Sequence, residues 1–308
     1  MRMDYKTEGA MNNLFQHSGL VWVKYSEYEL MDSDKGVSFI RPEPSAKPTL
    51  YNPLDDYESL IIDAINIGLL QITGQVDELY SALLEFMQKY GLLGFMTALP
   101  TTPRFIHYDA VYLPKNQYLT DETMTIDDYL LFFFPFDNFD FKKPGIDAGW
   151  SIGGDIKMVE GTLAFSPRPE DINICFRREY CESYVWLLRQ FTDWAFTLVS
   201  SRLYYEDYDR IDETTRDLYR RSISAFSGVA PTYNIVLYDK PEIVWNFQSL
   251  LTAIQTIFSF MLTDEKKPLR ICKHCSMAFI ARNPKTVFCS PKCKNQFNVY
   301  KSRSKRDE

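Results

Sequence analysis

The residues of this sequence best suited to chemistry are four cysteines near the C-terminal end. Cys272 and Cys275 form one close pair, and Cys289 and Cys293 form a second pair after thirteen intervening residues. Two tight pairs joined by a short loop match a structural zinc site, in which four thiolates surround the ion at about 2.3 Å. Nearby Lys and Arg side chains favour thiolate over thiol. The spacing predicts one structural zinc ion on these four cysteines, with His274 outside the ligand set.

The elements that must position these cysteines are visible in the surrounding sequence. Residues 269–272 and 278–281 flank the first pair and are predicted to be the strands of a hairpin. Ser290 and Pro291 suit the N-cap and first position of a helix that would run to about Arg303. A hairpin followed by a helix N-terminus predicts a small, treble-clef-like zinc finger. Its core would be aromatic, made by Phe279, Phe288, Phe297 and Tyr300.

Charge is distributed very unevenly between this segment and the rest of the chain. Residues 266–308 contain twelve Lys and Arg and two acidic residues, a net charge of +10, within a 308-residue protein of net charge −7. The other 265 residues contain 22 basic and 39 acidic side chains, a net charge of −17. A basic module on an acidic body indicates an anionic partner for the module.

The last predicted helix carries the residues expected to meet that partner. Lys294, Asn298, Lys301 and Lys305 follow one stripe, and Arg303 lies on the same helix. We expect them to contact DNA, with Arg282 and Lys285 reaching phosphate groups from the loop of the finger. The alternative is a solvated basic face that keeps a small finger soluble.

The cysteine segment resembles a known family. Ile271-Cys-x-x-Cys-x-x-x-Phe279, then Phe288-Cys-Ser-x-x-Cys-x-Asn295 and a basic helix, is similar to the CGNR-type zinc finger of bacterial transcription regulators with an ABATE-like N-terminal domain, and of related uncharacterised proteins. Lys294-Asn-Gln296 stands where that family has Gly-Asn-Arg. The resemblance covers about 40 residues and implies zinc binding and DNA binding.

Hydrophobic periodicity outlines the rest of the chain. Apolar residues at helical spacing predict helices that cover about 55–70, 75–90, 184–199, 210–226 and 242–262. Glycines and short apolar runs predict strands within residues 100–180. The expected fold is therefore α+β, with a mostly helical N-terminal body, a strand-containing middle and the small C-terminal finger. The expected domains are 1–263, a hinge at 264–270, and 271–308.

Enzymatic and membrane functions are not indicated. The sequence Gly149-Trp-Ser-Ile-Gly153 fits a nucleophile elbow, but the flanking residues predict neither the strand nor the helix that such an elbow needs, and the only histidine that follows is His274. A zinc ion with four cysteine ligands has no open position for substrate. Residues 243–262 lack charge, but their apolar residues form a core-facing stripe. With no signal peptide at the start, we expect a cytoplasmic protein that is not an enzyme.

Two functions remain. The first is a DNA-binding zinc-finger protein, a bacterial transcription regulator whose N-terminal domain senses a ligand or partner. The second is a protein- or RNA-interaction module in which the finger is purely structural. Self-association is compatible with both.

Overall fold

The computed structural model describes residues 20–95, 109–112, 123–136, 158–159, 162–163 and 177–307, except residues 207, 227, 229, 248 and 284. Side chains are also outside the described set at 112, 158–159, 162–163, 206, 225 and 304–307. All statements below concern the described residues.

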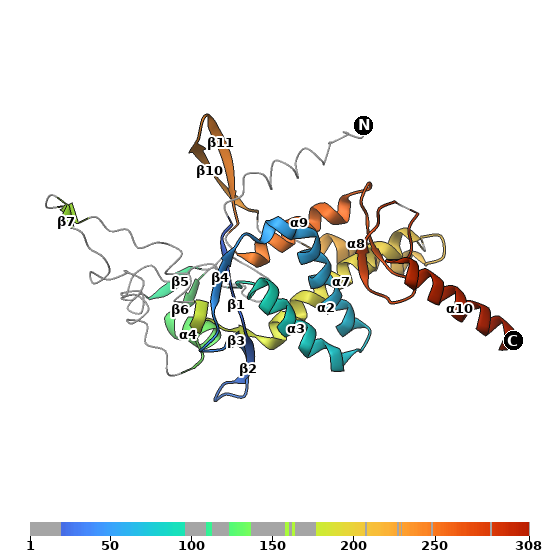
Figure 1. The fold of residues 1–308 in the computed structure, drawn as a ribbon, viewed down its shortest axis with the longest axis horizontal. Helices are drawn as coiled ribbons and strands as arrows, with labels where there is room; N and C mark the ends of the chain where they lie inside the picture. Colours follow the sequence, from blue (N-terminus) through green and yellow to red (C-terminus); the bar gives the residue numbers. More distant parts are fainter. Residues whose placement is uncertain are drawn as a thin grey trace.

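Helices form the centre of the protein (Figure 1). They are α2 (Tyr57–Ile72), α3 (Val76–Tyr90), α7 (Tyr184–Glu206) and α9 (Leu250–Thr263). Each carries apolar residues at helical spacing, and these residues are buried in one continuous core. The predicted helices near 55–70, 75–90 and 184–199 are confirmed, with bounds that differ by a few residues.

The closest helix packing is between α2 and α7. Gly68 of α2 faces the backbone of Phe191 on α7, and a Cβ atom at position 68 would lie 2.0 Å from the Phe191 carbonyl oxygen. Only glycine permits the two backbones to approach this closely. This contact fixes α2, which also supports the C-terminal cysteine segment described below.

Short antiparallel strands cover one side of the helices. β1 (Trp22–Tyr25) pairs with β4 (Pro48–Tyr51). A three-stranded sheet has the order β2 (Tyr28–Asp32), β3 (Ser38–Pro42) and β9 (Glu182–Ser183), so it joins the N-terminal strands to the residues that directly precede α7. The short 3-10 helix η1 (Pro53–Asp56) leads from β4 into α2.

The described part of the middle region contains two strand pairs and one helix. They are β5 (Ala110–Tyr112) with β6 (Thr123–Thr125), α4 (Ile126–Phe133), and β7 (Met158–Val159) with β8 (Thr162–Leu163). These strand pairs agree with the prediction of strands within residues 100–180. The Gly149–Gly153 sequence lies outside the described residues.

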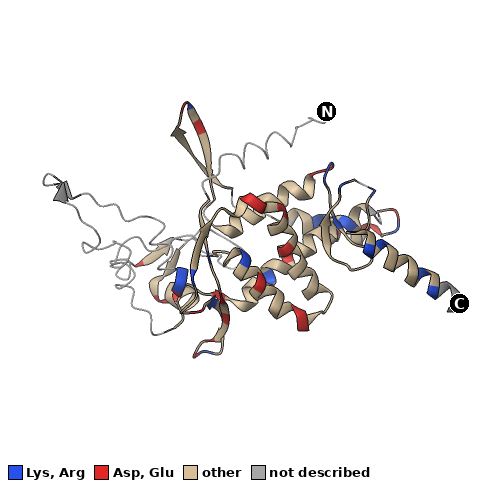
Figure 2. Cartoon of the chain, in the orientation of Figure 1, with Lys and Arg blue, Asp and Glu red and all other residues tan. Residues whose placement is uncertain are grey.

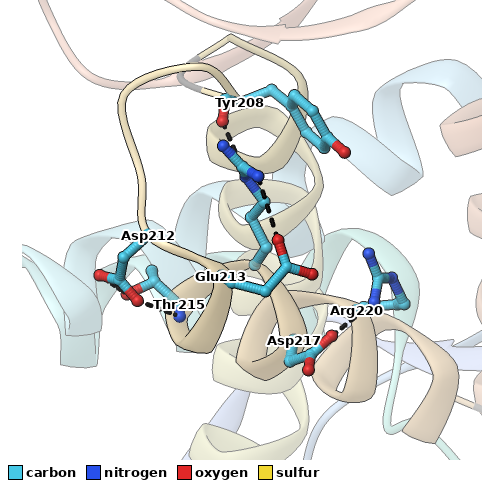
Figure 3. A network of polar contacts seen from close by, with 7 residues as sticks. Tyr208, Asp212, Glu213, Thr215, Asp217 and Arg220 are labelled. Carbon is cyan, nitrogen blue, oxygen red and sulfur yellow. Dashed lines mark hydrogen bonds and ion pairs between the residues drawn. The ribbon is translucent and has the colours of Figure 1, made fainter.

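Helix α8 (Glu213–Ala225) begins at a well-formed polar cap (Figure 3). Asp212 accepts a hydrogen bond of 2.9 Å from the backbone N–H of Thr215, which satisfies a donor at the helix start. Arg216 then donates to the Tyr208 carbonyl oxygen and pairs with Glu213, so it ties the preceding turn to the helix. These contacts explain why this mostly polar helix starts where it does.

The predicted helix over 242–262 is wrong in its first third. Residues 232–246 form a hairpin of β10 (Thr232–Leu237) and β11 (Pro241–Asn246), and α9 begins only at Leu250. Ser249 caps α9 by accepting a hydrogen bond from the backbone N–H of Thr252. The hairpin projects from the rest of the described chain (Figure 1).

The observed architecture is thus mixed helix and strand, as the predicted α+β class requires at the coarse level. Among the helices in the described ranges, none is both long enough and apolar enough to cross a membrane. This finding concerns only those ranges.

The buried carboxylate of Glu182 joins β9 to the segment that follows α3. The carboxylate accepts hydrogen bonds from the backbone N–H groups of Leu93 (2.8 Å), Gly94 (2.5 Å) and Phe95 (3.0 Å), and from the Tyr180 hydroxyl (2.6 Å). Four donors converge on one fully enclosed side chain, so removal of the carboxylate would leave several buried donors unsatisfied.

We predict that Glu182→Leu lowers the free energy of unfolding by at least about 3 kcal/mol, because it orphans these donors. The exposed Glu85→Leu on α3 is the matched control and should change stability by about 0.5 kcal/mol or less. Urea denaturation followed by circular dichroism measures both. Equal stability of the two variants would contradict the assigned role of Glu182.

Candidate metal centre

The sulfur atoms of the four paired cysteines converge on one point. The Sγ atoms of Cys272, Cys275, Cys289 and Cys293 all lie within 4.8 Å of one another. Cys275 and Cys289 are separated by 3.7 Å, and Cys289 and Cys293 by 3.4 Å. A tetrahedral site with 2.3 Å metal–sulfur bonds has edges of about 3.8 Å, so these separations suit a metal ion. The cysteine cluster can hold one metal ion.

Two local elements bring the cysteines together. β12 (Leu269–Ile271) pairs with β13 (Ala278–Ile280), and Cys272 and Cys275 lie in the turn between them. The second pair lies at the start of α10 (Pro291–Asp307), where Ser290 accepts a hydrogen bond of 3.2 Å from the backbone N–H of Cys293. The predicted hairpin, N-cap and helix are confirmed. Residues 269–307 are called the cysteine module from here on.

The turn of the hairpin aims backbone N–H groups at sulfur. Ser276 adopts a positive φ of 59°, and its N–H donates to the Cys272 carbonyl oxygen. Burial raises the pKa of Cys272, but backbone N–H groups of Cys275, Cys289 and His274 oppose it and hold the pKa at about 6. Hydrogen bonds to the thiolate favour the form that binds metal.

The pKa of the Cys289 thiol shifts in the opposite direction. Burial raises the pKa of Cys289 to about 12, with further contributions from the neighbouring sulfurs of Cys293, Cys272 and Cys275. Several thiolates cannot share so small a volume without a positive charge between them. A bound cation removes this repulsion and allows all four sulfurs to ionise together. The donor set therefore fits a metal ion.

His274 does not join the cluster. Its Nε2 lies 3.1 Å from the Gln296 amide oxygen, and its ring stacks on Tyr300 with centroids 5.7 Å apart. The contacts therefore join the hairpin to α10 across the metal position. Phe288 and Phe297 add an aromatic contact, with centroids 5.2 Å apart, which agrees with two members of the expected aromatic core. The prediction is wrong for Tyr300, which is 59% exposed and therefore does not lie in a core.

The cysteine module is attached firmly to the helical body. Asn66 on α2 accepts a hydrogen bond of 2.7 Å from the backbone N–H of Ala278 on β13. Leu269 and Ala278 are buried in the same core as the helices. At the predicted hinge 264–270, the Asp264 carboxylate accepts hydrogen bonds from the backbone N–H groups of Lys266 and Lys267. The Pro268 carbonyl oxygen accepts a hydrogen bond from the backbone N–H of Ala281.

The residues expected to contact nucleic acid are separate from the cysteine cluster. Lys294, Asn298, Lys301 and Arg303 are exposed on α10, and Arg282 and Lys285 are exposed on the loop between β13 and α10. Lys305 belongs to α10, but its side chain is outside the described set. Figure 2 shows Lys and Arg positions along α10 in blue and Asp and Glu positions on the helices and strands of the body in red.

Helical geometry separates one residue from the others. At 100° per residue, Lys294, Asn298, Lys301 and Lys305 share one face of α10, whereas Arg303 lies about 180° from Lys294. Arg303 therefore lies on the opposite face of α10 from the stripe, and its contact with DNA stays a prediction. Sequence analysis also missed Asn66, because no local signal marks a residue whose partner is 212 positions away.

Comparisons with protein-family models, with curated proteins and with solved structures find no match to this chain. The resemblance to CGNR-type fingers accordingly stays a prediction. The structure shows a four-cysteine cluster that can hold a metal ion, at the N-terminal end of the exposed basic helix α10.

Proposed function

We propose that this protein is a cytoplasmic zinc-binding regulator whose cysteine module contacts DNA, and that it is not an enzyme. The observation that carries the proposal is the convergence of four Sγ atoms at the start of a helix with exposed Lys294 and Lys301. The helical body would sense a ligand or a partner.

Zinc is the metal that this donor set favours. Four thiolates are soft ligands, and a tetrahedral set made only of cysteine is typical of structural zinc or of iron–sulfur centres. A hairpin turn paired with a helix N-terminus is the arrangement of a treble-clef-like finger, in line with the CGNR resemblance. All four positions would be occupied by protein, so the ion would stabilise the module and would not activate water.

The metal would also hold α10 in a fixed orientation from which it could contact DNA. Cys293 lies in the first turn of α10, so a metal ion would fix the helix to the hairpin at that point. Lys294, Asn298 and Lys301 follow on one exposed face, where lysines suit phosphate oxygens and the amide suits a base edge. The −17 charge of the other 265 residues would keep DNA on this module alone.

We predict one zinc ion per chain in the purified protein, measured by inductively coupled plasma mass spectrometry. Cys289→Ser should lose at least about 90% of the metal, because one of four ligands is gone. Cys181→Ser is the control, since Cys181 lies outside the cysteine module and its buried thiol donates to the Glu179 carbonyl oxygen. Full zinc occupancy in Cys289→Ser would refute the assignment.

We predict that the protein binds random duplex DNA with a dissociation constant of about 1–100 μM at physiological salt. Fluorescence anisotropy at several salt concentrations should give a steep dependence of affinity on salt. The double variant Lys294→Glu/Lys301→Glu should reduce the slope of log K against log[salt] by about 2, because two phosphate contacts are lost.

Lys35→Glu/Lys47→Glu is the matched control for that experiment. Both lysines are exposed on the strand region of the body, and the change in net charge is identical. The control should bind DNA nearly as well as the parent. Equal losses in the two double variants would mean that net charge alone governs binding, and would contradict a DNA site on α10.

The second candidate function, a protein-interaction module, is favoured by the β10–β11 hairpin. The pairs Tyr233–Trp245, Ile235–Ile243 and Leu237–Pro241 are directly opposed, so six apolar residues share one face. Tyr233, Ile235 and Leu237 are 60%, 72% and 76% exposed. An exposed, contiguous apolar face is typical of a contact surface, and a second copy of the chain is the simplest partner.

For this candidate we expect a species larger than the 36.1 kDa monomer in light scattering, at micromolar protein. Ile235→Lys/Leu237→Lys should return it to the monomer, because the two charges interrupt the apolar face. Asn234→Lys lies on the opposite face of the same strand and should leave the size unchanged. A parent protein that is already monomeric would exclude self-association through the hairpin.

A further inference from the structure

A cavity of about 120 Å³ lies where the cysteine module meets α7. Val199 and Arg202 line it from α7, and Arg270 and Lys273 line it from β12 and the following turn. Its wall therefore comes from two parts of the chain that are about 70 residues apart in sequence. The cavity is separate from the exposed stripe of α10.

The charge lining the cavity has one sign. Arg202, Arg270 and Lys273 are its charged residues, and the described lining includes no carboxylate. Burial and, to a smaller extent, the nearby positive charge of Arg270 together lower the pKa of Arg202 to about 10. Two guanidinium groups and an ammonium group around one space attract an anion strongly, since the low-dielectric wall weakens screening.

The volume of the cavity and the geometry of its hydrogen-bond donors limit the kinds of anion that it can bind. A space of this volume exceeds by several-fold what one water molecule needs, so it can hold a group of several heavy atoms. Guanidinium groups form bidentate hydrogen bonds with phosphate and carboxylate oxygens. Two guanidinium groups and one ammonium group suit the several acceptor oxygens of a phosphate better than the two oxygens of a carboxylate, which favours a phosphate group.

We propose that this cavity binds a phosphate group, held by Arg202, Arg270 and Lys273. The ligand bridges α7 and β12, and it therefore strengthens the attachment of the cysteine module to the helical body in addition to the Asn66–Ala278 hydrogen bond. This site goes beyond the proposed DNA contact, because none of its residues belongs to α10. It gives the junction of α7 and the cysteine module a position at which a phosphate group binds.

The test is a titration of the full chain, as purified with its metal, with inorganic phosphate at constant ionic strength. Isothermal titration calorimetry should give a dissociation constant of about 1 mM or tighter. Arg202→Gln and Arg270→Gln should each weaken binding by at least about tenfold, because each removes a charged, bidentate donor. Arg221→Gln, at an exposed position on α8, is the control and should bind within about twofold of the parent.

Metal content and circular dichroism confirm that each variant is folded. Arg202→Lys is a second variant that keeps the charge on α7, and it should bind with an intermediate affinity because the bidentate geometry is lost. The proposal is overturned if the parent gives no binding heat up to about 20 mM phosphate, or if Arg202→Gln and Arg270→Gln bind phosphate as tightly as the parent.

The source of the phosphate group is resolved by two further titrations. If a nucleoside monophosphate binds in the presence of saturating duplex DNA, and Arg202→Gln leaves DNA affinity unchanged, the ligand is a free phosphate monoester. If duplex DNA competes with phosphate and Arg202→Gln weakens both, the cavity receives a backbone phosphate. Phosphate binding is measured without DNA, so failure of the DNA proposal leaves this result unaffected.

Discussion

The cysteine module depends on the convergence of four sulfur atoms within 4.8 Å. Its own core is small: Phe288 packs against Phe297, whereas the stack of His274 on the exposed Tyr300 lies at the surface. A segment of this size buries too little apolar surface to be stable alone, and such units usually need a metal or a disulfide. The crowded thiols, which would repel one another once ionised, become the strongest link of the module when a cation lies between them.

The helical body also stabilises the cysteine module, through contacts of α2 and α7. The close approach of α2 and α7 at Gly68 fixes the helix that carries Asn66, and Asn66 in turn holds β13 by the backbone of Ala278. The strands of the module then present Arg270 and Lys273 to Arg202 on α7. Thus the docking of the hairpin depends on the packing of α2 against α7, and the cationic cavity depends on that docking. The exposed helix α10 extends from it (Figure 1).

Much of the candidate metal centre could be predicted from the sequence, because its information is local. Two cysteine pairs, two short apolar runs and the Ser290–Pro291 cap lie within about 30 residues and specify the hairpin, the helix start and the convergence of sulfurs. The central helices could also be predicted from their apolar period. At that coarse level, the mixed helix-and-strand architecture and the metal-binding cluster agree with the sequence interpretation.

The remaining features depend on contacts that a local pattern does not encode. Ile243 and Phe247 continue the apolar period of α9 backwards, yet Ile243 lies on β11 and is 51% exposed, because Ser249 caps the helix and residues 232–246 pair as a hairpin. Asn66, Glu182 and the cavity beside Arg202 arise only when distant segments meet.

The central claim is that the four sulfurs bind one zinc ion in a closed tetrahedral site. X-ray absorption at the zinc edge of the purified full-length chain tests it most directly, because the first coordination shell reports both the identity and the number of ligand atoms. The account predicts four sulfur neighbours at about 2.3 Å and no nitrogen or oxygen neighbour. A shell that contains nitrogen or oxygen atoms, or a protein without zinc absorption, would contradict it.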